Sequence, residues 1–432
     1  MGDSYHERLT ALAGARGLIA PAVDLGVAEQ VRGRQEPVRT LVRWISAFKA
    51  MDFQEELVEE LTARSEGWSR LLVLPTGAGK TAVAAISVLR WLAEKQGTIV
   101  WIAPQRELVA QANAVVGRMW EAGLGPDSLD LVSLPAGAGA IWGTRSRVLF
   151  ATPQLLLRNS ELFRSVRSTS PIAVVVDEAH HFGADAFASV VQPLSGTGRK
   201  VLGLSATPRA SAPTSRQAIA QVFPDGLLMS ERLGKNPVEA LRQRGVLSQL
   251  IHSDIPIPEA KRSGVFSFAS KWRLRDLVVD DDRWNAIIEH ICAHGDTDRQ
   301  IVCCLDRAHG VALACALRAR GLEGVAYIDG EYSFSDRAAV LEAFHKGKIR
   351  TLVQVQLVME GVDLPSADSI VLTHPLSSEV ESAQAIGRVL RGPKVGGTTV
   401  AKVVSPDVDQ AWINQTIDLG DLPLTGWKVR WA

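Results

Sequence analysis

A glycine-rich turn between an apolar run and a helical stretch is the first part of this chain whose residues predict chemistry. Residues 71–74 lead into the turn 75–81, PTGAGKT. Glycines let backbone N–H groups wrap phosphate oxygens, Lys80 can reach β- and γ-phosphates, and Thr81 at a helix N-terminus can bind Mg²⁺. Leu74 replaces the first glycine of the strict pattern, and a plain glycine-rich turn is the alternative. The turn alone predicts a nucleotide site, with contacts from Thr76, Gly77, Ala78, Gly79, Lys80 and Thr81.

Two adjacent carboxylates, Asp177 and Glu178, follow the apolar run 174–176. At the carboxyl edge of a parallel sheet, Asp177 can hold the Mg²⁺ that bridges two phosphates. Glu178 can then orient and deprotonate an attacking water. The alternative is an acidic helix N-terminus, which the helix dipole favours. Together with the glycine-rich turn, the pair predicts nucleotide hydrolysis.

Two arginines and a glutamine near the C-terminal end are spaced for one helical face. Gln384, Arg388 and Arg391 stand at i, i+4 and i+7, so a helix would project them together. Two guanidiniums on one face favour an anion opposite them, and a triphosphate between two domains would serve. Arginine fingers raise such rates by about 10³ to 10⁵. A solvated basic face is the alternative.

Two series of short apolar runs, each alternating with helical stretches, must position these residues. Continuous apolar runs indicate strands buried on both faces of a parallel sheet with helical crossovers. We therefore expect an α/β protein of two successive units. The runs are 71–74, 98–103, 148–151, 172–176 and 201–204 in the first unit, and 301–305, 325–328, 351–355, 369–373 and 400–404 in the second.

The remaining segments set the expected domain boundaries. Leu41, Trp44, Ile45 and Phe48 fall on one helical face, which indicates an N-terminal helical cap. The mixed middle segment can be a linker, an insertion or the edge of the second unit. The prediction is a helical region at 1–50, a first domain at 51–210, a linker or insertion at 211–285, a second domain at 286–405 and a tail at 406–432.

Composition limits the class of protein. The 432 residues carry 47 basic and 47 acidic side chains, a net charge of zero. This balance excludes a protein whose whole surface is basic, but it does not exclude local basic surfaces. The 4 cysteines form no CxxC pair, so a disulfide framework or structural zinc is not expected. No apolar run reaches the roughly 18 residues of a membrane span. We expect a cytoplasmic protein without a membrane partner.

The motifs occur in an order that resembles superfamily 2 DEAH-box helicases, most of all the type III restriction-subunit-like group. The resemblance covers about residues 53–393. Besides the segments above, it rests on FQ at 53–54, APQREL at 103–108, ATPQ at 151–154, DEAH at 177–180, SATP at 205–208, EGVDLP at 360–365 and QAIGRVLR at 384–391.

The resemblance implies two tandem RecA-like P-loop domains with ATP and Mg²⁺ bound between them. It implies catalytic roles for Lys80, Asp177, Glu178, Gln384, Arg388 and Arg391, with Thr81 and Asp177 on the metal. Further nucleotide contacts would come from Phe53, Gln54, Gly361 and Asp363, and coupling between sites from His180, Ser205 and Thr207. Nucleic-acid contacts would come from Gln105, Arg106, Thr152, Arg307 and Met359, although ordinary loop polarity explains each equally well.

The expected function is that of an ATP-dependent helicase or translocase on single-stranded or duplex nucleic acid, DNA more than RNA. An alternative is the ATPase subunit of a defence, restriction or repair complex in which a protein partner supplies the nuclease. A scaffold without hydrolysis is disfavoured because Lys80, Asp177, Glu178 and Arg388 are all present.

Overall fold

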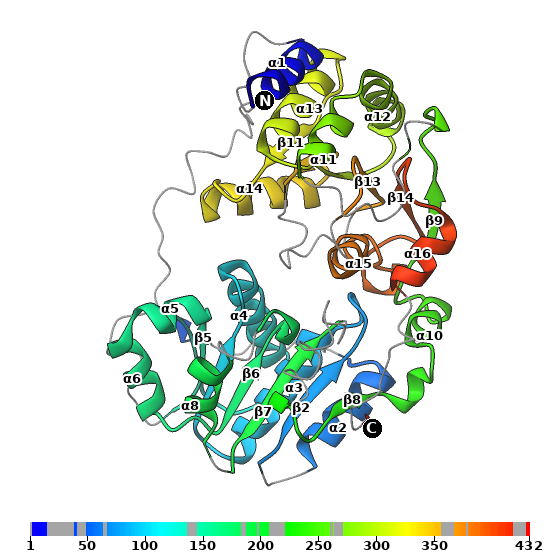
Figure 1. Ribbon diagram of the computed structural model, residues 1–432. Coiled ribbons are helices and arrows are strands. Elements are labelled where there is room, and N and C mark those ends of the chain that lie inside the picture. Colours follow the sequence, from blue (N-terminus) through cyan, green and yellow to red (C-terminus); the bar gives the residue numbers. More distant parts are fainter. Residues whose placement is uncertain are drawn as a thin grey trace. The chain divides into compact units, whose positions relative to one another are not determined.

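The computed structural model divides the chain into two compact units, each built on its own sheet (Figure 1). One comprises Gln35–Ala240 and Leu419–Ala432, and the other Met1–Arg34 and Leu241–Asp418. We call them the first and second domains. The structure describes residues 2–14, 39–40, 49–63, 67–135, 145–182, 187–196, 198–206, 221–259, 262, 271–355, 367–376, 379–417 and 429–432.

The first domain holds a nine-stranded sheet in the order β1-β4-β5-β3-β6-β7-β2-β8-β15. All pairings are parallel except that of β1 with β4. In sheet order the strands are Arg39–Thr40, Leu129–Ser133, Ser146–Ala151, Thr98–Ile102, Ala173–Val176, Lys200–Ser205, Ser69–Val73, Leu227–Met229 and Val429–Trp431. Every residue of β3, β5 and β6 is buried, as the continuous apolar runs predict.

Helices cross over between these strands. Alternate residues of the central strands, among them Val100, Ile102, Val174 and Val176, form a core with residues of α5, α6 and α8. The helical segments are α2 (Asp52–Thr62), α3 (Lys80–Glu94), α4 (Arg106–Glu121), α5 (Pro153–Arg158), α6 (Ser160–Ser168), η2 (Ala179–His181), η3 (Phe187–Val191), α8 (Gln192–Ser195) and η4 (Glu231–Leu233).

The second domain holds a six-stranded sheet in the order β11-β12-β10-β13-β14-β9, parallel throughout. In that order the strands are Val325–Ile328, Thr351–Gln354, Gln300–Cys303, Ser369–Leu372, Val400–Val404 and Gln249–Ser253. Its helical segments are α1 (Gly2–Ala13), α11 (Lys271–Val278), α12 (Asp281–His294), α13 (Arg307–Ala319), α14 (Phe334–His345), α15 (Glu379–Gly387), η7 (Pro393–Val395) and α16 (Gln410–Ile417), and α10 (Pro237–Gln243) spans the domain boundary. The prediction of two parallel α/β domains is confirmed.

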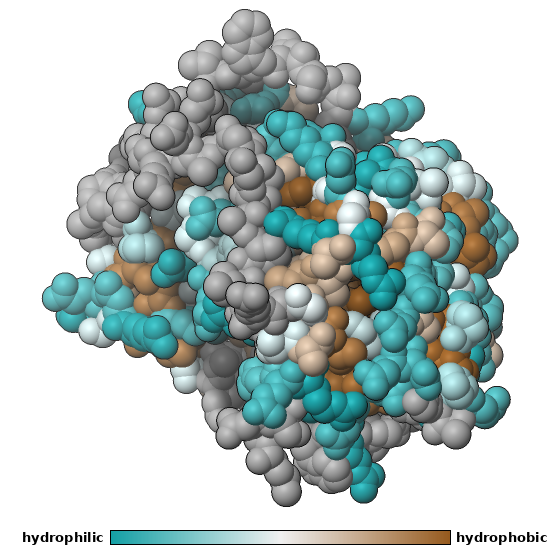
Figure 2. Space-filling model, turned by 90° about the horizontal axis from the view of Figure 1, so that it is seen from above, coloured by the Kyte–Doolittle hydropathy of each residue, from teal (hydrophilic) through white to brown (hydrophobic). Residues whose placement is uncertain are grey.

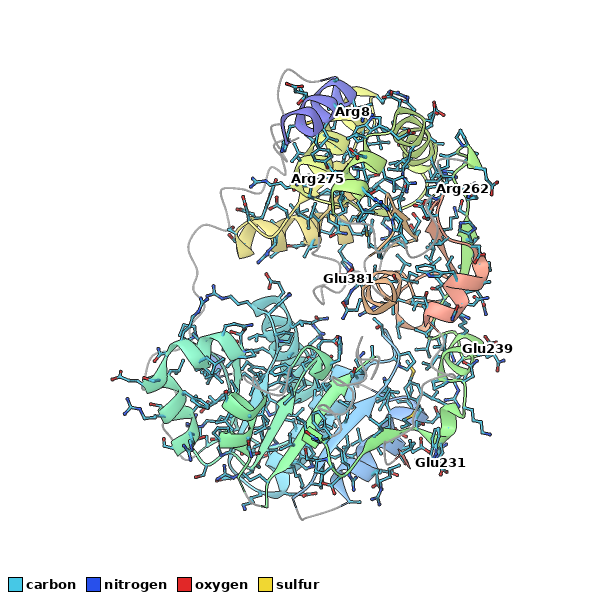
Figure 3. The ribbon with its side chains drawn as sticks, viewed as in Figure 1. Arg8, Glu231, Glu239, Arg262, Arg275 and Glu381 are labelled. Atoms are coloured by element: carbon cyan, nitrogen blue, oxygen red, sulfur yellow. The ribbon has the colours of Figure 1, made fainter. Side chains whose placement is uncertain are left out.

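The N-terminal helix α1 packs on the second domain, although the first domain follows it in sequence. Tyr5, Leu9 and Ala13 are buried in the second domain's core. The Tyr5 hydroxyl donates to Asp306 Oδ1 at 3.1 Å, and Arg8 Nη2 donates to the Val279 carbonyl at 2.7 Å. Figure 3 shows Arg8 on α1 and Arg275 on α11 in this region. The predicted apolar helical face at 41–48 lies outside the described residues.

The middle segment and the tail supply strands to both sheets. The middle segment, 211–285, contributes β8 to the first sheet and β9 to the second. From the tail, β15 pairs with β8, and Arg430 Nε lies 2.8 Å from Glu60 Oε1 on α2. The domain boundaries predicted from the sequence stay predictions, because the order of segments along the chain does not show which domain each segment joins.

A buried ion pair joins α12 of the second domain to the residues after β14. The side chains of Arg283 and Asp407 are 0% exposed. Arg283 Nη1 donates to Asp407 Oδ1 at 3.0 Å, and its Nε donates to the Thr373 carbonyl at 3.1 Å. The guanidinium is thus held from two sides.

We expect Asp407→Ala to lower the free energy of unfolding by about 3 to 5 kcal/mol, because it leaves a buried guanidinium without its counter-ion. Asp254→Ala is the control, since the Asp254–Arg262 pair is 46% and 31% exposed and such a pair contributes about 0 to 1 kcal/mol. Urea unfolding curves of both variants measure the difference. Equal losses would contradict the assigned role of burial.

The described helices carry no membrane-spanning segment, because none combines the necessary length and apolar character. Among the coloured residues of the face shown in Figure 2, hydrophilic ones are interspersed with separate apolar patches.

Candidate nucleotide and nucleic-acid site

The predicted site residues of the first domain follow the carboxyl ends of neighbouring parallel strands. Val73 of β2 pairs with Ser205 of β7, and Ile102 of β3 pairs with both Val176 of β6 and Ala151 of β5. The segments that follow these strands therefore share one edge of the sheet. Ligands of open α/β sheets bind at this edge.

The glycine-rich turn connects β2 to the N-terminus of α3. Gly77 and Gly79 have φ of 85° and 87°, a left-handed conformation that glycine adopts without steric cost. Gly79 is the N-cap and Lys80 the first residue of the helix. The first N–H groups of a helix have no partner within the helix, and the helix dipole favours an anion there.

Gln54 connects α2 to this turn. Its Oε1 accepts from the Met51 backbone N–H at 3.0 Å, and its Nε2 donates to the Ala78 carbonyl at 3.0 Å. A Cβ on Gly79 would lie 2.5 Å from Gln54 Nε2, and the φ of 87° is strained for any residue other than glycine. The Gln54 side-chain amide thus stabilises the turn through the Ala78 carbonyl, a role that the sequence did not predict. Adenine recognition by Gln54 and the fully buried Phe53 stays a prediction.

Asp177 and Lys80 are mostly buried at this edge, 5% and 8% exposed. Burial, and next the negative charge of Glu178, raise the pKa of Asp177 to about 7, while the Lys80 charge opposes the rise. A buried carboxylate beside a second one favours an additional cation. The oxygens of Asp177 and Thr81 suit Mg²⁺, so the residues present fit this metal.

Glu178 occupies a strained backbone conformation with φ 45° and ψ 51°. This left-handed region is costly for a residue other than glycine, and such strain clusters at functional sites. Only the three-residue turn η2 follows, so little helix dipole is present to explain two acidic residues. The alternative of a helix N-terminus loses its support.

His180 joins the DEAH segment to the end of β7. Its Nδ1 lies 3.1 Å from Ser205 Oγ and 3.5 Å from Glu178 Oε2, and Ser205 is fully buried. This hydrogen-bond partner belongs to the same domain as His180. The third predicted coupling residue, Thr207, lies outside the described residues.

The first-domain residues predicted to contact nucleic acid gather where β3 and β5 end. The Ala103 backbone N–H donates to the Ala151 carbonyl at 3.1 Å, so the two following segments are neighbours. Gln105 is the N-cap of α4 and Thr152 the N-cap of α5. Gln105 Oε1 is buried and accepts no hydrogen bond from any residue that the structure describes. Arg106 is exposed, so two helix N-termini and a cation share this part of the edge.

In the second domain, Arg307 begins α13 after β10. Its guanidinium is 54% exposed, with Nε 3.3 Å from Asp329 Oδ2, and it also pairs with Glu331. A bound phosphate would therefore compete with two carboxylates. Met359, Gly361 and Asp363 lie outside the described residues.

The prediction that Gln384, Arg388 and Arg391 share a helical face is wrong. Helix α15 ends at Gly387, and the Arg388 N–H donates to the Ala385 carbonyl at 3.1 Å in a turn. Arg391 instead forms an antiparallel bridge with Leu247. The helix stops because the backbone beyond it pairs with the segment that precedes β9. Gln384 is buried, and both arginines are partly exposed.

Known protein families match both domains. Residues 51–214 match the DEAD/DEAH box helicase model, and residues 282–393 match the helicase conserved C-terminal domain model. The first match contains the glycine-rich turn and the DEAH segment, and the second contains Arg388.

Individual proteins agree with these matches. The putative ATP-dependent helicase IRC3 of Saccharomyces cerevisiae is 25% identical over 82% of this chain, which spans 51% of that protein. The ATP-dependent DNA helicase MPH1 of Coccidioides immitis is 34% identical over 41% of this chain and 16% of its own length. The solved structure of S. cerevisiae Dbp5 bound to RNA and ADP BeF3 has a TM-score of 0.58 at 18% identity, covering 92% of this chain and 90% of that one; at this identity it shows the fold alone. The chain thus carries a DEAD/DEAH box helicase domain followed by a helicase conserved C-terminal domain, and it spans about half the length of IRC3.

Proposed function

We propose that this chain is a nucleic-acid-dependent ATPase that translocates along a single strand, DNA in preference to RNA. The observation that carries the proposal is the shared edge of the first sheet. Segments after β2, β7 and β6 suit a nucleotide, and those after β3 and β5 suit a phosphate backbone. Because β6 and β3 are hydrogen-bonded neighbours, a change at one site reaches the other through a single strand pair.

In this proposal, the hydrolytic roles are assigned to side chains at the first sheet's edge. Lys80 and the α3 N-terminus would bind the phosphates, Asp177 and Thr81 would hold Mg²⁺, and Glu178 would orient the attacking water. When bound, Mg²⁺ neutralises charge that develops on the β- and γ-phosphate oxygens. His180 transmits changes at Glu178 to Ser205, which its Nδ1 contacts.

The second domain completes the site in this proposal. Arg388 and Arg391 stabilise negative charge in the transition state. Because they belong to a different domain from Lys80, domain closure switches hydrolysis on.

The preference for DNA rests on the sequence relatives. MPH1 is named as a DNA helicase, whereas the RNA-bound Dbp5 shares only the fold. A net charge of zero implies a grip by a few local contacts, among them Arg106 and Arg307, rather than by a basic surface. Such contacts are independent of base sequence and sensitive to salt.

We expect single-stranded DNA to raise the ATPase rate, because strand binding favours the closed, active arrangement. Lowering the activation free energy of hydrolysis by only about 1.4 kcal/mol raises the rate tenfold. Steady-state ATPase assays with single-stranded DNA, duplex DNA and RNA of equal length test the proposal, and a salt titration should weaken the stimulation. No response to any of the three nucleic acids would refute it.

A further inference from the structure

The residues with which the chain returns to the second domain, from Leu241 on, pair with the loop that carries the two arginines. The domain boundary falls between Ala240 and Leu241, and β9 begins at Gln249. Between them, the Ser248 N–H donates to the Leu390 carbonyl at 2.7 Å, and the Gly392 N–H donates to the Val246 carbonyl at 2.9 Å. The antiparallel bridge between Leu247 and Arg391 lies between these two bonds.

The Ser248 side chain adds a second layer to this attachment. Its Oγ lies 2.6 Å from the Arg391 carbonyl and 2.6 Å from the Thr398 carbonyl, so one hydroxyl proton is shared between two acceptors. Ser248 is 0% exposed. The Arg391 carbonyl also accepts from the Thr398 backbone N–H at 3.0 Å, so the hydroxyl and this backbone bond together hold the two ends of the loop 391–398.

Two glycines mark close backbone approaches, one between the loop and residues 245–246 and one within the loop itself. A Cβ on Gly392 would lie 2.5 Å from the Gly245 carbonyl oxygen. A Cβ on Gly397 would lie 1.9 Å from the Arg391 carbonyl oxygen. Neither position tolerates a side chain unless the backbone moves. The arrangement of the loop 391–398 therefore depends on the connector, residues 241–248, as well as on its own sequence.

We propose that Ser248 is a positioning residue for Arg388 and Arg391, through which the connector 241–248 sets where the arginines stand. The proposal rests on the function proposed above. A force on α10, which spans the boundary, reaches the backbone of Arg391 within a few residues of chain. The connector thus does more than tether the domains, because its position sets that of the arginines.

The test compares two serine-to-alanine substitutions in the second domain. Ser248→Ala removes the shared hydroxyl. Ser369→Ala is the matched control, since Ser369 is 1% exposed and its Oγ has no hydrogen-bond partner among the described residues. Gly392→Ala displaces the same loop without touching Ser248.

We expect Ser248→Ala and Gly392→Ala to lower kcat about 10- to 100-fold, the effect of a displacement near 1 Å. The KM for ATP should stay within about twofold, because phosphate binding rests on Lys80. Ser369→Ala should leave both constants unchanged. Hydrogen exchange at 388–398 should accelerate in Ser248→Ala and not in Ser369→Ala, while exchange in the first domain stays the same.

Several results would overturn the proposal. One is an unchanged kcat in Ser248→Ala, with or without faster exchange. Another is a lower kcat accompanied by faster hydrogen exchange throughout the second domain, which would indicate a structural role only. If the parent chain shows no nucleic-acid-dependent ATPase, the proposed function fails instead, and unchanged exchange at 388–398 in Ser248→Ala would separately refute the positioning role.

Discussion

Replacing Lys80 by alanine should abolish ATP hydrolysis, with kcat/KM at least about 10²- to 10³-fold lower, the usual effect of removing one preorganised donor to a developing charge. The ammonium lies at the start of α3, where phosphate oxygens meet the helix N-terminus. Its loss also acts on Asp177. The Lys80 charge holds the pKa of that carboxyl below the value that burial and Glu178 favour, so the pKa rises further in the variant and less carboxylate is ionised for Mg²⁺ at neutral pH.

Steady-state ATPase assays with saturating single-stranded DNA measure this effect. Lys95→Ala is the control, because Lys95 follows the same helix at its other end and is exposed. Circular dichroism and thermal unfolding should show both variants folded. Normal turnover in Lys80→Ala would disprove the nucleotide site after β2.

Replacing Arg388 by alanine should leave ATP bound but almost unhydrolysed. An arginine finger contributes a factor of about 10³ to 10⁵ to kcat, and it acts on charge that develops only in the transition state. Binding of a fluorescent ATP analogue should therefore stay within about twofold of the parent value, while kcat collapses.

The control for this substitution is Arg320→Ala, an exposed arginine just after α13. Arg388→Lys adds a second comparison, because lysine keeps the charge but loses the planar fork of donors. An unchanged kcat in Arg388→Ala would show that Arg388 does not act as an arginine finger. A loss of ATP binding equal to the loss of kcat would instead make Arg388 a ground-state ligand.

Much of the fold could be predicted from the sequence. Each of the ten apolar runs corresponds to a strand, and the run 325–328 has the same bounds as β11. The runs are predictable because strands buried on both faces are apolar at successive positions. The strands β1, β4, β8, β9 and β15 at or next to the sheet edges were missed, since short or half-exposed strands such as β9, with Gln249 and Ile251 exposed, lack that signal.

Local sequence determined which residues stand at the first domain's edge. Gly77, Gly79 and Lys80 specify the glycine-rich turn, because only glycine adopts its left-handed positions freely and the helix begins directly after it. Asp177 and Glu178 follow a wholly buried strand, so their place at the sheet edge follows from the strand alone.

Only the tertiary structure decided the contacts between residues far apart in the chain. The i, i+4 and i+7 spacing predicted a helix through Arg391, but backbone hydrogen bonds of Leu390 and Gly392 with Ser248 and Val246 end it early. Likewise, α1 packs on the second domain because its Tyr5, Leu9 and Ala13 find apolar partners there. Spacing determines which side chains share a face when a helix forms, whereas the partners that long-range packing brings decide where the helix stops and which domain it joins.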